Sequence, residues 1–528
     1  MFINPDEVQV GDRLFRETRF AQFFFANSNG NVNATLRRGD PIVNTEVNAD
    51  GNPLSNPFRD QSMNCRNCHL GDDLLHVSNF QGRTYCDFAR RSPIPARPIA
   101  DGGDGRTVTP RNSQEIVSVS LARTTPNILH YDGEFASIED LTIGTMTGRN
   151  FGWLPSEYQI AKKHIVNVIK NDDGKNALGL RYGCGGLPYR VVLLGSDPRL
   201  PEGLRLPAKY RIDISVATDD QILHAIGALV HAYMDSIAFD TAEPPSPYDV
   251  FLSKNGLPTA PNAGESNAAY AQRLLGLINQ FKNPIFVTPS DGAFKLHRQQ
   301  FQFGANELRG LKTFFTQPNS ANQPHAGNCV ACHTPPAFTD NIFHNDGASQ
   351  IEYESVHGLG SFTKVTVPDL SARNADFDTY LPPSPNHPDA TGKFRSAASA
   401  AYPGATDLGV WNILANPDIP NPQTALTQIL CGEFNLTGAS CTPDAVLPMT
   451  VAFFKTPSIK DLGQSAPYLH SGSLDTLEAV VKFYTATSGM ARGGRLRNAS
   501  PELSNVFIDQ TDIPPLTAFL DSLNEDYH

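Results

Sequence analysis

Cys65-Arg66-Asn67-Cys68-His69 and Cys329-Val330-Ala331-Cys332-His333 are two copies of the pattern C-x-x-C-H, and they decide how the rest of the chain is interpreted. This pattern is typical of covalent haem attachment. Composition alone predicts on the order of 0.003 chance matches, so the two copies are not accidental. Cysteines three positions apart lie on one face of a helical turn, where both can form thioethers with the haem vinyl groups. The sequence therefore predicts two covalent haem c groups, with His69 and His333 under the two irons.

Two other sites also use C-x-x-C, namely a thioredoxin-like redox pair and half of a zinc site. A thioredoxin-like pair needs a surrounding βαβ pattern, and a zinc site needs a second pair of thiols or imidazoles nearby. Loop-like sequence with neither feature follows each motif. Haem attachment is therefore the favoured interpretation.

Length and charge narrow the class of protein further. The chain has 528 residues, enough for two to four domains with buried cores. Lys plus Arg number 42 against 54 Asp plus Glu, and the formal net charge is -12. No long basic run offers a surface for phosphates, so nucleic acid is not an expected partner.

The sequence also bears on membrane association and location. The most apolar stretch, Ile222 to Met234, is interrupted by His224 and His231, so we expect no membrane span. The first residues, Met1 to Glu7, lack the basic and apolar regions of a secretory signal. Either the chain is cytoplasmic or a signal has been removed. Because c-type haem attachment takes place outside the cytoplasm, we expect a periplasmic protein.

Four cysteines lie outside the haem motifs. Cys431 and Cys441 bracket a loop short enough to close as a disulfide in an oxidising compartment. Cys86 and Cys184 would then pair by elimination. Buried free thiols remain the alternative for each pair.

Helical periodicity predicts a mainly α protein with an internal duplication. Short amphipathic helices are expected before each haem motif, at Val10 to Phe15 and Glu307 to Phe315. Further helices are expected at Tyr158 to Lys170 and Asp219 to Ile237. Residues 373–423, crowded with Pro, Asn, Asp, Ser and Gly, indicate a long loop without a core of its own.

Several further segments resemble the superfamily of bacterial diheme cytochrome c peroxidases, which includes the MauG-type enzymes. The close matches are Phe338-Thr339-Asp340-Asn341-Ile342-Phe343-His344-Asn345, Phe454-Lys455-Thr456-Pro457-Ser458-Ile459-Lys460-Asp461 and Ala466-Pro467-Tyr468-Leu469-His470-Ser471-Gly472. Arg111-Asn112-Ser113 and Tyr131-Asp132-Gly133-Glu134 match less closely. The resemblance covers both haem regions but not most of residues 174–304, nor residues 373–423.

The resemblance implies two cytochrome c-type haem domains with long loop-rich insertions. Residues 1–245 would hold the peroxide-reactive haem, with His69 as its proximal ligand. Residues 246–528 would hold an electron-transfer haem with His333, and a loop insertion would span about 373–445.

The resemblance also suggests a second ligand for the His333 haem. In the family this ligand follows the A-P-Y-x-H histidine by a few helical turns, which leads here to Tyr484. Methionine there is typical of peroxidases that accept electrons from small redox proteins, whereas MauG-type enzymes have tyrosine. A phenolate favours the ferric state, while a thioether raises the haem potential. Alternatively, Tyr484 is a core aromatic, and Met490 or Met449 is the ligand.

Four residues are expected to serve catalysis. Glu157, in Pro155-Ser156-Glu157, resembles the family's distal carboxylate, which would move a proton between the peroxide oxygens. Glu157 is also well placed as an ordinary first-turn carboxylate of the following helix. Tyr131 takes the place of the family's tryptophan between the haems, and Trp153 could share that relay or be core. His470 is the histidine of A-P-Y-x-H, and Leu141 replaces a distal glutamine of the family.

A calcium ion is also implied by the resemblance. Asn112, Ser465 and Pro467 occupy the positions that supply an Asn side chain and carbonyl oxygens in the family. Hard oxygen ligands of this kind suit calcium.

Together these observations predict a haem peroxidase that reduces hydrogen peroxide at the His69 haem and stores or relays the second oxidising equivalent at the His333/Tyr484 haem. Electrons would come from a small redox protein, such as a cytochrome or cupredoxin, or from a protein substrate. The alternatives are a conventional cytochrome c peroxidase active when half reduced and a diheme cytochrome that only transfers electrons. An oxygenase is a more distant alternative.

Overall fold

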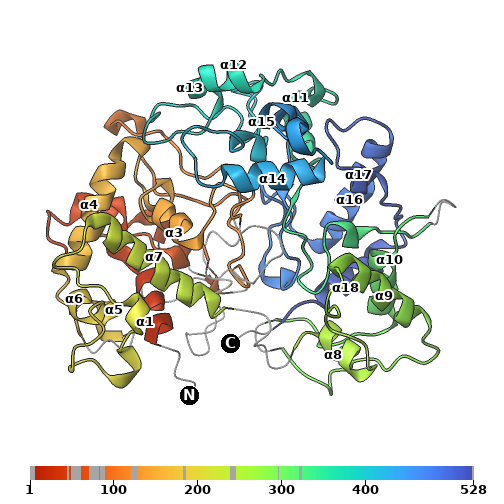
Figure 1. The fold of residues 1–528 in the computed structure, drawn as a ribbon, viewed down its shortest axis with the longest axis horizontal. Helices are drawn as coiled ribbons and strands as arrows, with labels where there is room; N and C mark the ends of the chain where they lie inside the picture. The colour runs from red at the N-terminus through yellow and green to blue at the C-terminus, as the bar shows by residue number, and fades with distance from the viewer. Residues whose placement is uncertain are drawn as a thin grey trace. The chain divides into compact units, whose positions relative to one another are not determined.

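The computed structural model describes residues 6–43, 47–48, 61–69, 82–83, 90–119, 128–181, 186–237, 245–294, 297–319 and 324–525. These residues are mainly helical (Figure 1). The chain divides into two compact units. Unit 1 comprises residues 1–122, 135–238 and 383–390, and unit 2 comprises residues 123–134, 239–382 and 391–528.

Unit 1 contains the first haem motif. Its helices are α1 (Asp6–Phe15), α2 (Gln22–Asn27), α3 (Ile138–Met146), α4 (Tyr158–Asn171), α5 (Ala177–Arg181), α6 (Tyr189–Val192) and α7 (Asp219–Asp235). Two short strands, β1 (Val47–Asn48) and β2 (Gly82–Arg83), pair antiparallel. The predicted helices before the first motif and at residues 158–170 and 219–237 are therefore confirmed as α1, α4 and α7.

The packing of unit 1 centres on α7, which lies against α1 and α3 (Figure 1). A glycine allows the closest approach, because a Cβ atom at Gly11 of α1 would lie 2.1 Å from the carbonyl oxygen of Leu229 in α7. A buried ionic network adds to the apolar core. Asp172 accepts hydrogen bonds from Arg13 and Arg19, both at 3.0 Å, and the Tyr189 hydroxyl donates to Glu17 at 2.9 Å.

Unit 2 contains the second haem motif. Its helices are α8 (Pro247–Lys254), α9 (Asn267–Asn279), α10 (Ala305–Phe315), α11 (Ala348–His357), α12 (Leu370–Ala375), α13 (Phe377–Tyr380), α14 (Gln423–Glu433), α15 (Pro443–Val446), α16 (Leu477–Arg492), α17 (Pro501–Ser504) and α18 (Ile513–Asp521). The strands β3 (Phe343–His344) and β4 (Phe454–Lys455) pair antiparallel, with Phe343 opposite Lys455. Helix α10 confirms the helix predicted before the second motif.

The helix crossing of unit 1 is repeated in unit 2, where α10 packs on α18 (Figure 1). A Cβ atom at Gly310 would lie 1.9 Å from the carbonyl oxygen of Pro515, so only glycine fits there. Aromatic side chains fill the core around this crossing, including the stacked pair Phe251 and Phe303 at 4.2 Å. Val330 of the haem motif belongs to the same core, which seats the motif on the packed helices.

The structure corrects the prediction that the insertion is a loop without a core. Within residues 373–445, α14 and α15 are helical, and several apolar side chains are fully buried. Trp411 packs edge-on against Phe394 at 5.2 Å, and the buried guanidinium of Arg373 donates to the carbonyl oxygens of Trp411 and Leu414. The apolar run Leu408 to Leu414 supplies this core, which the surrounding polar composition concealed.

The two units are not continuous along the chain. Residues 123–134 group with unit 2, and residues 383–390 group with unit 1. Each of these two segments is therefore grouped with a unit other than the one formed by its neighbours along the chain.

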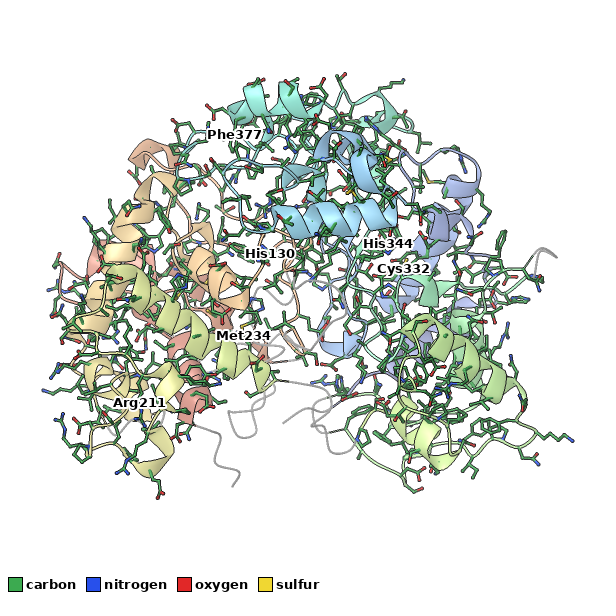
Figure 2. All side chains as sticks on the ribbon, in the orientation of Figure 1. His130, Arg211, Met234, Cys332, His344 and Phe377 are labelled. Carbon is green, nitrogen blue, oxygen red and sulfur yellow. A yellow bond between two sulfur atoms is a disulfide. The ribbon has the colours of Figure 1, made fainter. Side chains whose placement is uncertain are left out.

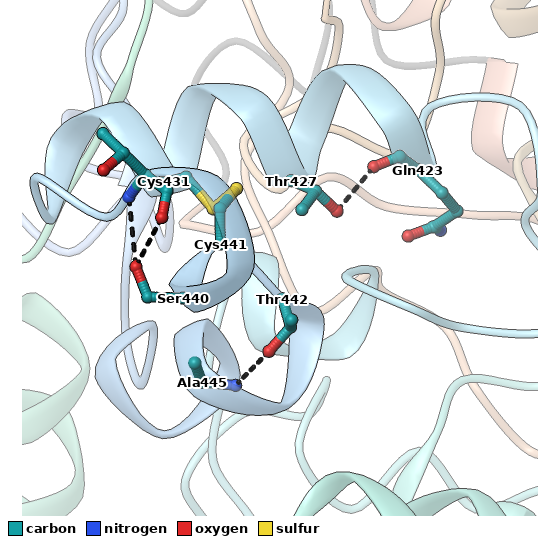
Figure 3. The surroundings of a disulfide bond; sticks show 8 residues. Gln423, Thr427, Cys431, Ser440, Cys441, Thr442 and Ala445 are labelled. Carbon is teal, nitrogen blue, oxygen red and sulfur yellow. Dashed lines mark hydrogen bonds between the residues drawn. A yellow bond between two sulfur atoms is a disulfide. The ribbon is translucent and has the colours of Figure 1, made fainter.

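The cysteines outside the haem motifs are partly described. Cys431 and Cys441 form the predicted disulfide, which ties the end of α14 to the following loop (Figure 3). Cys86 and Cys184 lie outside the described residues. None of the described helices has the length and apolar character required to cross a bilayer.

Candidate haem and redox sites

The second haem motif forms one tight helical turn, Cys329–Ala331. The N–H groups of Cys332 and His333 both donate to the carbonyl oxygen of Cys329, at 3.3 and 2.8 Å. Neither Cys329 nor Cys332 is in a disulfide. The turn therefore presents two thiols and the following imidazole, as covalent haem attachment requires.

The imidazole of His333 has the orientation expected of an iron ligand. Its Nδ1 lies 3.1 Å from the carbonyl oxygen of Phe338 and must donate a proton to it, because a carbonyl only accepts. Burial lowers the pKa of His333, so the ring is neutral. Ligating histidines usually donate their other ring N–H in this way and offer the remaining nitrogen to the metal.

Tyr484 lies on α16 close to this turn. Its hydroxyl is within electrostatic range of Asp346, Cys332 and Cys329. Burial and these neighbours raise the pKa of Tyr484 well above 10, so the phenol is neutral without iron. The rival methionines, Met449 and Met490, are both partly buried. The role of Tyr484 as the second haem ligand stays a prediction.

The first haem motif repeats the same local geometry. Cys65–Asn67 forms a tight turn, and the N–H groups of Cys68 and His69 donate to the carbonyl oxygen of Cys65, at 3.0 and 3.1 Å. The side chain of Asn67 accepts from the N–H of Asn64 at 2.9 Å and fixes the start of the turn. Both cysteines are free of disulfides. The residues of both motifs thus fit a covalent haem.

Glu157 ends the short turn Pro155–Glu157, directly before α4. Both of its carboxylate oxygens accept from Arg97, at 2.6 and 2.8 Å, and one also accepts from the N–H of Leu154. Burial raises the pKa of Glu157, but the hydrogen bonds from Arg97 and Leu154 outweigh it and hold the pKa below its usual value. This geometry fixes an ionised carboxylate at the start of a helix. Arg97 lies 60 positions from Glu157 in the chain, so no local pattern predicted it as the partner.

Tyr131 and His470 come together in unit 2. Their rings meet edge-on, with centroids 6.4 Å apart, and His470 stacks on Phe454 at 3.8 Å. The backbone of Tyr131 is anchored because its carbonyl accepts from the N–H of Lys455 at 2.7 Å. The structure thus builds an aromatic cluster of Tyr131, His470 and Phe454.

An ion pair from the insertion holds the turn after Tyr131. Arg395 contacts the carboxylate of Glu134 at 2.5 Å and that of Asp132 at 3.2 Å. Burial raises the pKa of Glu134, but Arg395 and His130 hold it well below its usual value. Sequence reasoning missed Arg395, since a contact over 261 positions leaves no local pattern.

Trp153 lies in the core of unit 1. It is 1% exposed, its indole N–H donates to the carbonyl oxygen of Phe20 at 3.0 Å, and its ring packs against Phe25 and His164. These are the contacts of an ordinary core residue. A role in electron relay stays a prediction.

The three predicted calcium ligands are divided between the units. Asn112 belongs to unit 1, whereas Ser465 and Pro467 belong to unit 2. The side chain of Asn112 accepts from the N–H of Ser113, and the Ser465 hydroxyl donates to the carbonyl oxygen of Asp461. The calcium site stays a prediction.

Comparisons with known proteins give local matches. No family model matches the chain. It is 32% identical over 77 residues to cytochrome c peroxidase IdrP1 of Denitromonas iodatirespirans, a match that covers 15% of this chain and 19% of that protein. It is 38% identical over 82 residues to the methylamine utilization protein MauG of Methylorubrum extorquens, which covers 15% and 21%. Each match spans about a fifth of the curated relative.

Two solved structures cover nearly the whole chain at low similarity. A MauG-like protein associated with microbial copper homeostasis is 15% identical, with a TM-score of 0.42 over 99% of this chain and 90% of that one. The diheme peroxidase BthA from Burkholderia thailandensis is 14% identical, with a TM-score of 0.43 over 99% and 87%. Likeness of this degree carries no argument about function.

Two C-x-x-C-H turns of the same geometry, with a partly buried tyrosine near the second, accompany the local matches to MauG and to a cytochrome c peroxidase. Both local matches agree with the resemblance of the sequence motifs to the superfamily of bacterial diheme cytochrome c peroxidases that includes the MauG-type enzymes.

Proposed function

We propose that this protein reduces hydrogen peroxide at the His69 haem site and stores the second oxidising equivalent at the site formed by His333 and Tyr484. A covalently bound haem supplies an iron that can bind peroxide and change its oxidation state. The position of Tyr484 is the observation that carries the proposal, because a tyrosine beside Cys329 and Cys332 can serve as an anionic ligand. Such a ligand favours the ferric state and disfavours prior reduction.

Glu157 is proposed as the group that moves a proton between the two peroxide oxygens. Arg97 orients the carboxylate and keeps it ionised. An ionised carboxylate can accept a proton from the peroxide directly. The same contacts also hold the short turn Pro155–Glu157 that precedes α4, and a separate experiment distinguishes the two roles.

Tyr131 is proposed to relay electrons within unit 2. An oxidised tyrosine must release its phenolic proton, and His470 is the titratable ring packed against it. The electron donor is proposed to be a small redox protein or a protein substrate.

The decisive experiment adds one equivalent of hydrogen peroxide to the fully ferric, haem-loaded protein without prior reduction. We expect rapid loss of both ferric signals in visible and EPR spectra, with new near-infrared absorption. Tyr484→Met should lose this response and react only after partial reduction. Met490→Leu is the matched control on the same helix and should respond as the unaltered protein does.

An unchanged spectrum in the unaltered protein would contradict the proposal. A reaction that appears only after half reduction would identify a conventional cytochrome c peroxidase. No reaction in any state would leave a diheme cytochrome that only transfers electrons.

A further inference from the structure

His344 lies in a buried cluster of carboxylates beside Cys332 of the second haem motif. It belongs to β3 and is 9% exposed. The side chains around it come from separate elements: Glu433 ends α14, Glu502 lies in α17, and Asp340 precedes β3. Figure 2 shows His344 next to Cys332.

The two ring nitrogens of His344 have different surroundings. Nε2 lies 2.8 Å from Oδ2 of Asp340, a normal hydrogen-bond distance. Nδ1 faces Oε1 of Glu433 at 3.6 Å and Oε2 of Glu502 at 3.8 Å. Within the described part of the chain, Nδ1 of His344 and Oε2 of Glu502 are buried atoms with no hydrogen-bond partner. Three polar atoms therefore converge without bonding to one another.

The spacing of these three atoms matches a metal site. Ligand atoms about 2.1 Å from a tetrahedral zinc ion lie about 3.4 Å apart, slightly closer than the separations seen here. A hydrogen bond would instead bring them to about 2.9 Å. The Asp340–His344 pair completes the pattern, since ligating histidines usually donate their other N–H to a carboxylate. From this geometry we propose that His344, Glu433 and Glu502 bind a divalent transition metal ion, with Asp340 orienting the imidazole.

Charge and access both suit a cation. Three carboxylates surround one imidazole, so the cluster carries excess negative charge that a dication would neutralise. The side chain of Glu502 is 33% exposed, whereas those of His344 and Glu433 are each 9% exposed. Glu502 thus opens the site to solvent. Cys332 also lies near His344, but haem attachment commits its sulfur to a thioether.

The three ligands are held by rigid contacts. The Cys431–Cys441 disulfide fixes the last turn of α14, two residues before Glu433 (Figure 3). Two hydrogen bonds tie β3 to the start of α17. The N–H of Asn345, next to His344, donates to the Ser500 hydroxyl at 2.8 Å, and the Ser500 N–H donates to the Asn345 carbonyl oxygen. Such preorganisation is what a metal site requires.

The proposal is tested by titrating Zn²⁺ into the full, haem-loaded protein after chelator treatment and restoration of calcium. Calorimetry and metal analysis after desalting should show one tightly bound zinc per chain. Glu433→Gln and Glu502→Gln should each weaken binding at least tenfold, and Asp340→Asn about 10- to 100-fold. His325→Gln is the matched control, because His325 with Asp509 and Asp512 forms another cluster of possible ligands in unit 2.

Three outcomes would overturn the proposal: no stoichiometric zinc, affinity unchanged in both glutamine variants, or loss of binding in His325→Gln. The haem Soret band and the thermal midpoint of each variant report whether it folds. Should the variants fail to fold, zinc X-ray absorption of the unaltered protein decides. A shell of nitrogen and oxygen at about 2.0 to 2.2 Å supports the site, and sulfur ligation refutes it. This test is independent of peroxidase activity.

Discussion

At the scale of single residues, Glu157 shows how one carboxylate can fit two roles. Its contacts with Arg97 and with the N–H of Leu154 hold the short turn Pro155–Glu157 in place before α4. The same contacts hold it ionised, as a proton acceptor must be. Geometry alone supports both, so the rate of the peroxide reaction must separate them.

We expect Glu157→Gln to slow the reaction of the ferric protein with hydrogen peroxide by about 10²- to 10⁴-fold, because the amide cannot accept the proton. Stopped-flow spectroscopy measures this rate. Asp104→Asn is the matched control, since Asp104 pairs with Arg149 in the same unit and has no proposed catalytic role. A normal rate combined with a lower melting temperature would show that Glu157 only stabilises the turn before α4.

At the scale of elements, a charged histidine joins two helices of unit 1. His231 of α7 contacts Glu139 of α3 at 2.7 Å and Asp235 of its own helix at 3.3 Å. These two carboxylates raise the pKa of His231 from 6.5 to about 9, against the opposing effect of burial. The interaction therefore stabilises the fold only while His231 is protonated.

The stabilisation by His231 should be complete below about pH 6.5 and lost as the pH rises through about 9. We expect His231→Gln to lower the free energy of unfolding by about 1 to 2 kcal/mol at pH 6, since partial exposure weakens the ion pairs. At pH 10 the difference should vanish. Denaturant unfolding at the two pH values measures it, and His224→Gln, exposed on the same helix, is the control. An equal loss at both pH values would mean that packing, not charge, is responsible.

At the scale of the whole molecule, each of the two units contains a haem motif and a pair of crossing helices, α1 with α7 and α10 with α18. Gly11 and Gly310 hold equivalent positions in the helix before each motif, and each faces a backbone carbonyl of the crossing helix. The two short sequence patterns before the motifs are alike for this reason. Both motifs should therefore be loaded independently of each other.

We expect two covalently bound haems per chain, counted by pyridine haemochrome absorbance and by the mass of the denatured chain. Replacing Cys65 and Cys68 by alanine should remove one haem, and so should replacing Cys329 and Cys332. Replacing Cys431 and Cys441 should remove none, because the structure joins them in a disulfide. A chain that retains both haems without Cys65 and Cys68 would refute the assignment of the first motif.

The haem motifs, the helices before them and the Cys431–Cys441 disulfide were predictable from local sequence. Each depends on residues at most about ten positions apart, where spacing and periodicity leave a local pattern. Which distant side chains meet depends on tertiary packing, as for Arg97 with Glu157, Arg395 with Glu134, and Glu433 with His344. The core around Trp411 was missed for the same reason, since burial there depends on packing between separate segments rather than on local composition.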